Sequence, residues 1–75
     1  MNPNLPPYAL RLRRLRERRG LKRRAVSELC GLSQNMVKRY EEGTVEPGAT
    51  ALTALAEFYG VSTDYLLGRP PKKYF

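Results

Sequence analysis

The chain has no histidine, no tryptophan and a single cysteine, Cys30, among its 75 residues. One cysteine excludes an internal disulfide and fits a reducing cytosol, and so few soft ligands argue against a metal site. No apolar stretch approaches the roughly 18–20 residues needed to span a bilayer. The opening MNPNLPPYAL lacks a basic segment followed by an apolar run, so we expect no signal peptide. These absences predict a cytoplasmic protein that needs neither metal nor cofactor and does not enter membranes.

The chain is long enough for one domain only, because domains hold about 50–200 residues. Hydrophobic residues make up 41% of it, which favours a folded chain over a disordered one. We expect no separate effector domain within these 75 residues and see no sign of a site for a small-molecule effector.

The net charge of +7 is unevenly distributed. Residues 1–43 contain eleven Lys or Arg against four Glu, a balance of +7, whereas residues 44–75 contain three basic against three acidic residues. A basic excess confined to part of a domain is typical of polyanion binding, although a merely soluble basic surface has the same composition.

The spacing of apolar residues predicts an all-α domain over residues 8–68, with helices at about 8–19, 23–30, 34–42, 49–59 and 63–67. Glycines mark most of the helix ends, and Ser33 and Ser62 are expected to be N-caps of the third and fifth helices. Residues 1–7 form an arm and residues 69–75 a tail. Strand-like alternation is lacking, so the sequence favours a compact five-helix domain.

The second and third predicted helices are separated only by Gly31-Leu32-Ser33. Such a tight turn needs a residue that adopts positive φ, and close helix crossing needs a small residue, for which Ser27 is suitable. This is the arrangement of a helix-turn-helix, although an ordinary helical hairpin shares the pattern.

The exposed face of the third helix favours the helix-turn-helix interpretation. It carries Gln34, Asn35, Lys38 and Arg39. Gln and Asn pair bidentately with adenine, and Arg or Lys pairs with guanine, so these four residues are candidate base contacts in the major groove.

A second set of candidates would hold DNA phosphates. Lys22, Arg23 and Arg24 lie at the start of the second helix, where the helix dipole disfavours basic residues unless a phosphate binds there. Ser33 and Thr44, at the two ends of the third helix, are further phosphate candidates. The arginines of the first helix fit either phosphate contact or simple solvation.

From about Leu12 to Leu67 the chain resembles the Cro/repressor (XRE-type) helix-turn-helix DNA-binding family. The resemblance rests on RGL at 19–21, Gly31-Leu32-Ser33, SQNMVKRYEEG at 33–43, Pro47 and LAEFYGVSTDYLL at 55–67. It implies that Gln34, Asn35 and Arg39 read bases and that Arg23 holds a phosphate. It also implies that Arg16 and Glu41 form a structural ion pair between the first and third helices.

The sequence departs from this family at two places. The small residue of the second helix is usually alanine; here it is Ser27, which needs a hydrogen-bond partner if it is buried. The loop after Gly43 often carries basic residues or Asn, whereas here it contains Glu46, which would repel phosphate.

The function indicated is a sequence-specific transcriptional regulator of double-stranded DNA, most simply a repressor that binds a two-fold symmetric operator as a homodimer. Thr63 and Tyr65, with Pro70, Pro71, Tyr74 and Phe75 of the tail, form the candidate dimer interface, because relatives often use this region; Tyr65 could also only cover the small core. Activation through a contact to polymerase is the other regulatory mode.

The main alternative is an antitoxin-like interaction protein that uses Leu10, Leu29 and Phe58. RNA and membrane partners fit less well, since there is no aromatic stacking platform and no broad apolar face. An enzyme is not expected, because Glu41 and Glu42 have no histidine beside them and Cys30 lies on an inward helix face.

Overall fold

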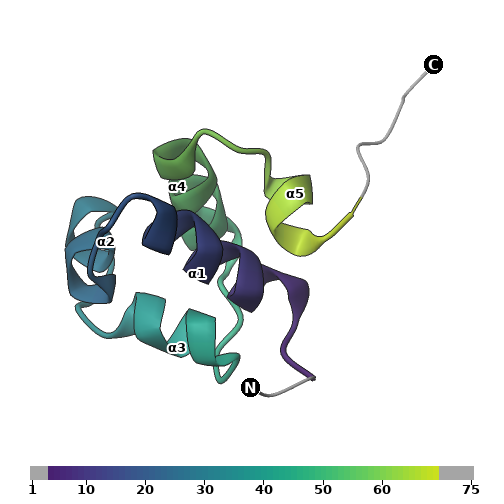
Figure 1. Ribbon diagram of the computed structural model, residues 1–75, viewed down its shortest axis with the longest axis horizontal. Coiled ribbons are helices and arrows are strands. Elements are labelled where there is room, and N and C mark those ends of the chain that lie inside the picture. The colour runs from purple at the N-terminus through teal and green to yellow at the C-terminus, as the bar shows by residue number, and fades with distance from the viewer. Residues whose placement is uncertain (1–3, 70–75) are drawn as a thin grey trace.

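Five short α-helices and their connecting turns make up residues 4–69, the part of the chain that the computed structural model describes (Figure 1). They are α1 (Pro7–Arg18), α2 (Arg23–Leu29), α3 (Met36–Glu42), α4 (Ala49–Tyr59) and α5 (Thr63–Leu67). None of them is long and apolar enough to cross a membrane. The predicted all-α fold is confirmed, since no strand occurs within these residues.

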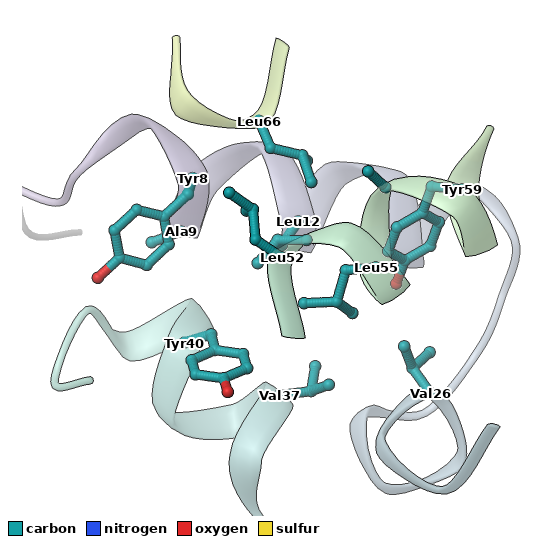
Figure 2. Packing of buried hydrophobic residues seen from close by; sticks show 11 residues of the cluster. Tyr8, Ala9, Leu12, Val26, Val37, Tyr40, Leu52, Leu55, Tyr59 and Leu66 are labelled. Carbon is teal, nitrogen blue, oxygen red and sulfur yellow. The ribbon is translucent and has the colours of Figure 1, made fainter. Parts of the chain in front are cut away.

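Every helix contributes to one hydrophobic core. Leu12 of α1, Val26 of α2, Val37 of α3, Leu55 of α4 and Leu66 of α5 are almost completely buried. Figure 2 shows Leu55 pointing into the middle of this cluster from α4, with Val37 facing it from α3. Each helix buries only one face in this small core, so its apolar residues recur at helical spacing. That is why apolar spacing in the sequence predicted the helices.

Helix α1 lies at the centre of the arrangement. It contacts α3 on one side and α5 on the other, α2 contacts α3, and α4 contacts α5 (Figure 1). Pro7 is at the first turn of α1, where its missing N–H has no helical partner to lose. The segment before α1 packs on the end of α3, because Gly43 leaves room for Leu5 and Pro6: a Cβ at Gly43 would lie 3.0 Å from Leu5 Cδ2.

Helices α4 and α5 have the predicted bounds, and the expected cap of α5 is present. Ser62 Oγ accepts a hydrogen bond from the Tyr65 N–H at 3.0 Å. Gly60, between the two helices, has φ +68°, which glycine adopts at least cost.

Helix α3 begins later than predicted. It starts at Met36 with Asn35 at the N-cap position and no side-chain cap, so the assignment of Ser33 as its N-cap is wrong. The Ser33 carbonyl instead accepts from the Met36 N–H at 3.0 Å, closing a turn, and the Val37 N–H donates to Ser27 Oγ at 3.1 Å. Ser27 is fully buried, and the hydrogen bond that its burial requires is thus present.

A bidentate ion pair ties α1 to α3. Arg16 Nε lies 2.7 Å from Glu41 Oε2, and Arg16 Nη2 lies 2.9 Å from Glu41 Oε1. A third nitrogen, Nη1, donates to the Leu21 carbonyl at 2.9 Å, in the turn before α2. The Arg16 and Glu41 side chains are only 14% and 4% exposed, and the hydrogen bond to Glu41 raises the pKa of Arg16. One guanidinium therefore fixes the relative positions of α1, α3 and the entry to α2.

Removing Arg16 should be costly, since it leaves the Glu41 carboxylate buried without a partner. We expect Arg16→Met to lower the free energy of unfolding by about 3 kcal/mol, measured by urea denaturation. Arg13→Met is the matched control, because Arg13 pairs with Glu17 at 3.2 Å while both side chains are 54% exposed. It should cost less than about 1 kcal/mol. Equal losses in the two variants would show that the Arg16–Glu41 pair does not hold the fold together.

Candidate nucleic-acid interface

A groove of about 660 Å³ opens between α1, the start of α2 and α3. Six basic side chains and two carboxylates line it, a balance of +4, together with two amides. The lining residues are Arg13, Arg16, Lys22, Arg23, Arg24, Gln34, Asn35, Lys38, Glu41 and Glu42. Because Arg16 already neutralises Glu41, the remaining charge of the groove comes from five cations and the carboxylate of Glu42.

Six of the nine residues selected from the sequence as DNA contacts share this groove. Lys22, Arg23 and Arg24 enter it from the start of α2, and Gln34, Asn35 and Lys38 enter it from the turn before α3 and from α3 itself. All six are exposed. The tight α2–α3 turn is what brings these two groups together, since they are separated by about a dozen residues in sequence.

The cations at the start of α2 have little local compensation. The first turn of α2 contains no acidic residue, and Lys22 at the N-cap position provides no side-chain cap. Arg24 reaches Glu28 at 3.3 Å, but the two side chains are 70% and 61% exposed, so this pair contributes little. Within residues 4–69, Lys22 and Arg23 make no ion pair. This arrangement is suited to an anion that arrives from outside.

The other three DNA-contact candidates lie outside the groove. Arg39 follows Lys38 on α3 and is exposed, and Ser33 is exposed in the turn before α3. Thr44 lies at the opposite end of α3, where its N–H and its hydroxyl both donate to the Arg39 carbonyl, at 3.1 and 3.2 Å. Thr44 therefore completes the C-terminal turn of α3, and its hydroxyl proton is already used.

Arg11 of α1 and Arg19, at the C-cap position of α1, have structural partners that the sequence did not reveal. Arg19 donates to the carbonyls of Phe58 and Tyr59 at 2.8 and 3.2 Å, at the end of α4, and lies over both rings. Arg11 donates to the Tyr65 carbonyl and lies 4.5 Å from the centre of the Tyr65 ring. Contacts between residues so far apart in sequence leave no periodic signal. Of the α1 arginines beyond Arg16, only Arg13 lines the groove.

The surface around α5 lies apart from the groove. Figure 1 shows α5 on the opposite side of α1 from α3. Tyr65 is 40% exposed, whereas Thr63 is half-buried. The four tail residues assigned to the same surface, Pro70, Pro71, Tyr74 and Phe75, lie outside the described residues.

The three apolar residues proposed for an interaction surface, Leu10, Leu29 and Phe58, differ in exposure. Leu29 is 65% exposed, but Leu10 is only half-exposed and Phe58 packs against the core beneath Arg19. Cys30 is partly buried, and its burial raises the pKa of the thiol. No group of three or more Cys, Asp or Glu side chains converges within residues 4–69.

Comparison with known proteins matches residues 7–67 to the family described as "Helix-turn-helix domain". Among curated relatives, the SPbeta prophage-derived HTH-type transcriptional regulator YonR of Bacillus subtilis is 35% identical over 60 residues, 80% of this chain and 56% of the relative. The HTH-type transcriptional regulator ImmR of the same organism is 34% identical over 59 residues, 79% of this chain and 46% of the relative. The chain thus spans about half the length of these relatives.

Solved structures with the same fold include repressor domains. The P22 c2 repressor in complex with a synthetic operator has a TM-score of 0.76 and 28% identity, covering 80% of this chain and 91% of that chain. The restriction-modification controller protein C.AhdI of Aeromonas hydrophila has a TM-score of 0.71 and 27% identity, covering 79% and 86%. The resemblance predicted from the sequence is confirmed: the chain belongs to the Cro/repressor (XRE-type) helix-turn-helix family, a family of DNA-binding domains and not of enzymes.

Proposed function

We propose that this protein binds double-stranded DNA sequence-specifically and regulates transcription, with α3 as the recognition helix in the major groove. The observation that carries the proposal is the groove in which the amides of Gln34 and Asn35 meet the cations at the start of α2. Amides and guanidinium groups match the hydrogen-bonding edges of bases, and adjacent cations match phosphates. The relatives named as transcriptional regulators and the operator complex of the P22 c2 repressor support it.

Base reading falls to the start and the exposed face of α3. Gln34 and Asn35, in the turn before α3, would contact adenine, and Lys38 and Arg39 would contact guanine. All four side chains are exposed, and Lys38 and Arg39 make no ion pair within residues 4–69. They are therefore available to a duplex without breaking an internal contact.

We assign phosphate binding to Lys22, Arg23 and Arg24 at the start of α2 and to Ser33 in the turn before α3. Thr44 is left out of this set, because its hydroxyl donates to the Arg39 carbonyl. The Glu46 carboxylate in the same loop would also repel a phosphate there. The grip on DNA is thus assigned to one end of α3, next to the start of α2.

We further propose that two copies bind a two-fold symmetric operator and repress by excluding polymerase. One recognition helix reads only a few base pairs, so a single copy discriminates poorly against a genome. Tyr65 and Thr63 on α5 are the proposed contact between copies. They lie on the far side of α1 from α3, so they would stay accessible while α3 lies in the major groove of the DNA (Figure 1).

Base reading is tested by selecting bound duplexes from a random pool. Arg39→Ala, or Gln34→Ala with Asn35→Ala, should relax the preference at a few positions, each good bidentate contact being worth about 1–3 kcal/mol. Arg14→Ala is the control, because Arg14 is also exposed and lies outside the groove; it should leave the selected sequence unchanged. If the α3 variants select the wild-type sequence, the recognition face has been misassigned.

The phosphate grip is tested by the salt dependence of binding. Replacing Lys22, Arg23 and Arg24 with Gln should weaken specific and non-specific duplexes alike and reduce the log–log salt slope by about one for each phosphate that is no longer bound. The control replaces Arg14, Arg18 and Arg69 with Gln, which removes the same charge from exposed positions outside the groove. Its slope should change much less. If both triple variants reduce the salt slope equally, the loss reflects total charge alone, and Lys22, Arg23 and Arg24 are not specific phosphate contacts.

The dimer is tested by cooperativity on an operator with two half-sites. Tyr65→Asp should weaken cooperative binding there and leave a single half-site bound as before, because a charge would be buried between the copies. Leu29→Asp is the control, since Leu29 is the other large exposed apolar side chain among residues 4–69. A loss of cooperativity in Leu29→Asp with none in Tyr65→Asp would move the interface to α2.

A further inference from the structure

A buried hydroxyl links α2 to the first turn of α3. Ser27 is 0% exposed, and its Oγ accepts from the Val37 N–H at 3.1 Å. Val37 is the second residue of α3 and is itself 1% exposed. Helix α3 has no side-chain cap of its own, since Asn35 at the N-cap position makes no such bond. The hydroxyl of a different helix therefore satisfies one of the N–H groups that the start of α3 leaves unpaired.

We propose that Ser27 is a positioning residue for base reading: it caps the recognition helix from α2 and so determines where that helix begins. The proposal rests on the proposed function of α3. It adds to that function a residue that never touches DNA.

The hydrogen bonds around the turn explain how Ser27 acts. With the Val37 N–H directed to Ser27, the Ser33 carbonyl accepts from the Met36 N–H at 3.0 Å, three residues ahead. A regular α-helical bond would instead join the Ser33 carbonyl to the Val37 N–H, four residues ahead. Ser27 thus takes the donor that would extend α3 backwards by two residues, about half a turn. Gln34 and Asn35 consequently lie in a turn outside the helix.

The directions of the Gln34 and Asn35 side chains depend on whether the Val37 N–H donates to Ser27 or to the Ser33 carbonyl. Side chains in a turn and in the first turn of a helix project differently from the backbone, because their φ and ψ differ. Asn35 has φ −103° and ψ 4°, outside the helical region. Extension of α3 would therefore re-aim Gln34 and Asn35, while Lys38 and Arg39, already inside the helix, would keep their directions.

Replacing Ser27 with alanine removes the hydroxyl and little else. The Val37 N–H, still buried, must then find another acceptor, and the Ser33 carbonyl is its regular helical partner. We expect α3 in Ser27→Ala to begin near Gln34.

The experiment has one arm without DNA and one with it. In the free protein, NMR chemical shifts of Gln34 and Asn35 in Ser27→Ala should become helical. With DNA, the ratio of specific to non-specific affinity for a single half-site should fall roughly tenfold, as expected when one good bidentate base pairing is removed. The altered preferences should coincide with the positions affected by Gln34→Ala and Asn35→Ala, and those affected by Arg39→Ala should be unchanged, as should the salt slope.

Ser62→Ala is the matched control, because Ser62 Oγ also accepts one backbone N–H, at the start of α5. It should lower stability without changing the specificity ratio. Unchanged shifts and unchanged base preference in Ser27→Ala would overturn the proposal, as would a uniform loss at every base position in both serine variants. If the wild-type protein does not discriminate between duplexes, the proposed function fails, and the base-reading role of Ser27 fails with it. The NMR arm separates that outcome from a failure of the cap itself.

Discussion

The ion pair between Arg16 and Glu41 is the constraint on which the arrangement of the other parts depends. Its three hydrogen bonds join α1, α3 and the turn before α2 at one guanidinium. These are also the elements that line the groove, so this ion pair ties the walls of the groove to one another. In a core to which each helix contributes only one buried face, a bidentate pair supplies the directional restraint that apolar packing lacks.

The arginines of α1 and its C-cap show that a basic composition does not by itself identify a DNA-binding surface. Arg16 holds the fold together, Arg19 satisfies carbonyls at the end of α4, and Arg11 covers Tyr65 on α5. Only Arg13, besides Arg16, lines the groove. The net charge of +7 therefore includes cations with structural partners and cations that face solvent. Among the second group, the three cations at the start of α2 line the groove and are the ones to which we assign phosphate binding.

How far the sequence predicted the structure depended on the range of the interactions involved. Helices α4 and α5 were located to the residue, because a local cap at Ser62 and a glycine at position 60 define their ends. The start of α3 was missed by two residues: the Val37 N–H donates to the buried Ser27 hydroxyl of α2, a contact between two helices that apolar spacing does not signal. The partners of Arg11 and Arg19 are 54 and about 40 residues away and were not predictable from spacing. The groove itself was largely predictable, since a short turn brings its two groups of residues together.

The central claim is that DNA lies against α3 and the start of α2, and NMR mapping of a protein–duplex complex tests it most directly. An isotope-labelled protein would be titrated with a mixed-sequence duplex at low salt, and the amide shifts followed residue by residue. We expect the largest shifts on residues 22–24 and 34–39, with little change on the outer face of α4 around Thr50 and Thr53. Shifts centred on α4 or α5, with α3 unaffected, would contradict the claim.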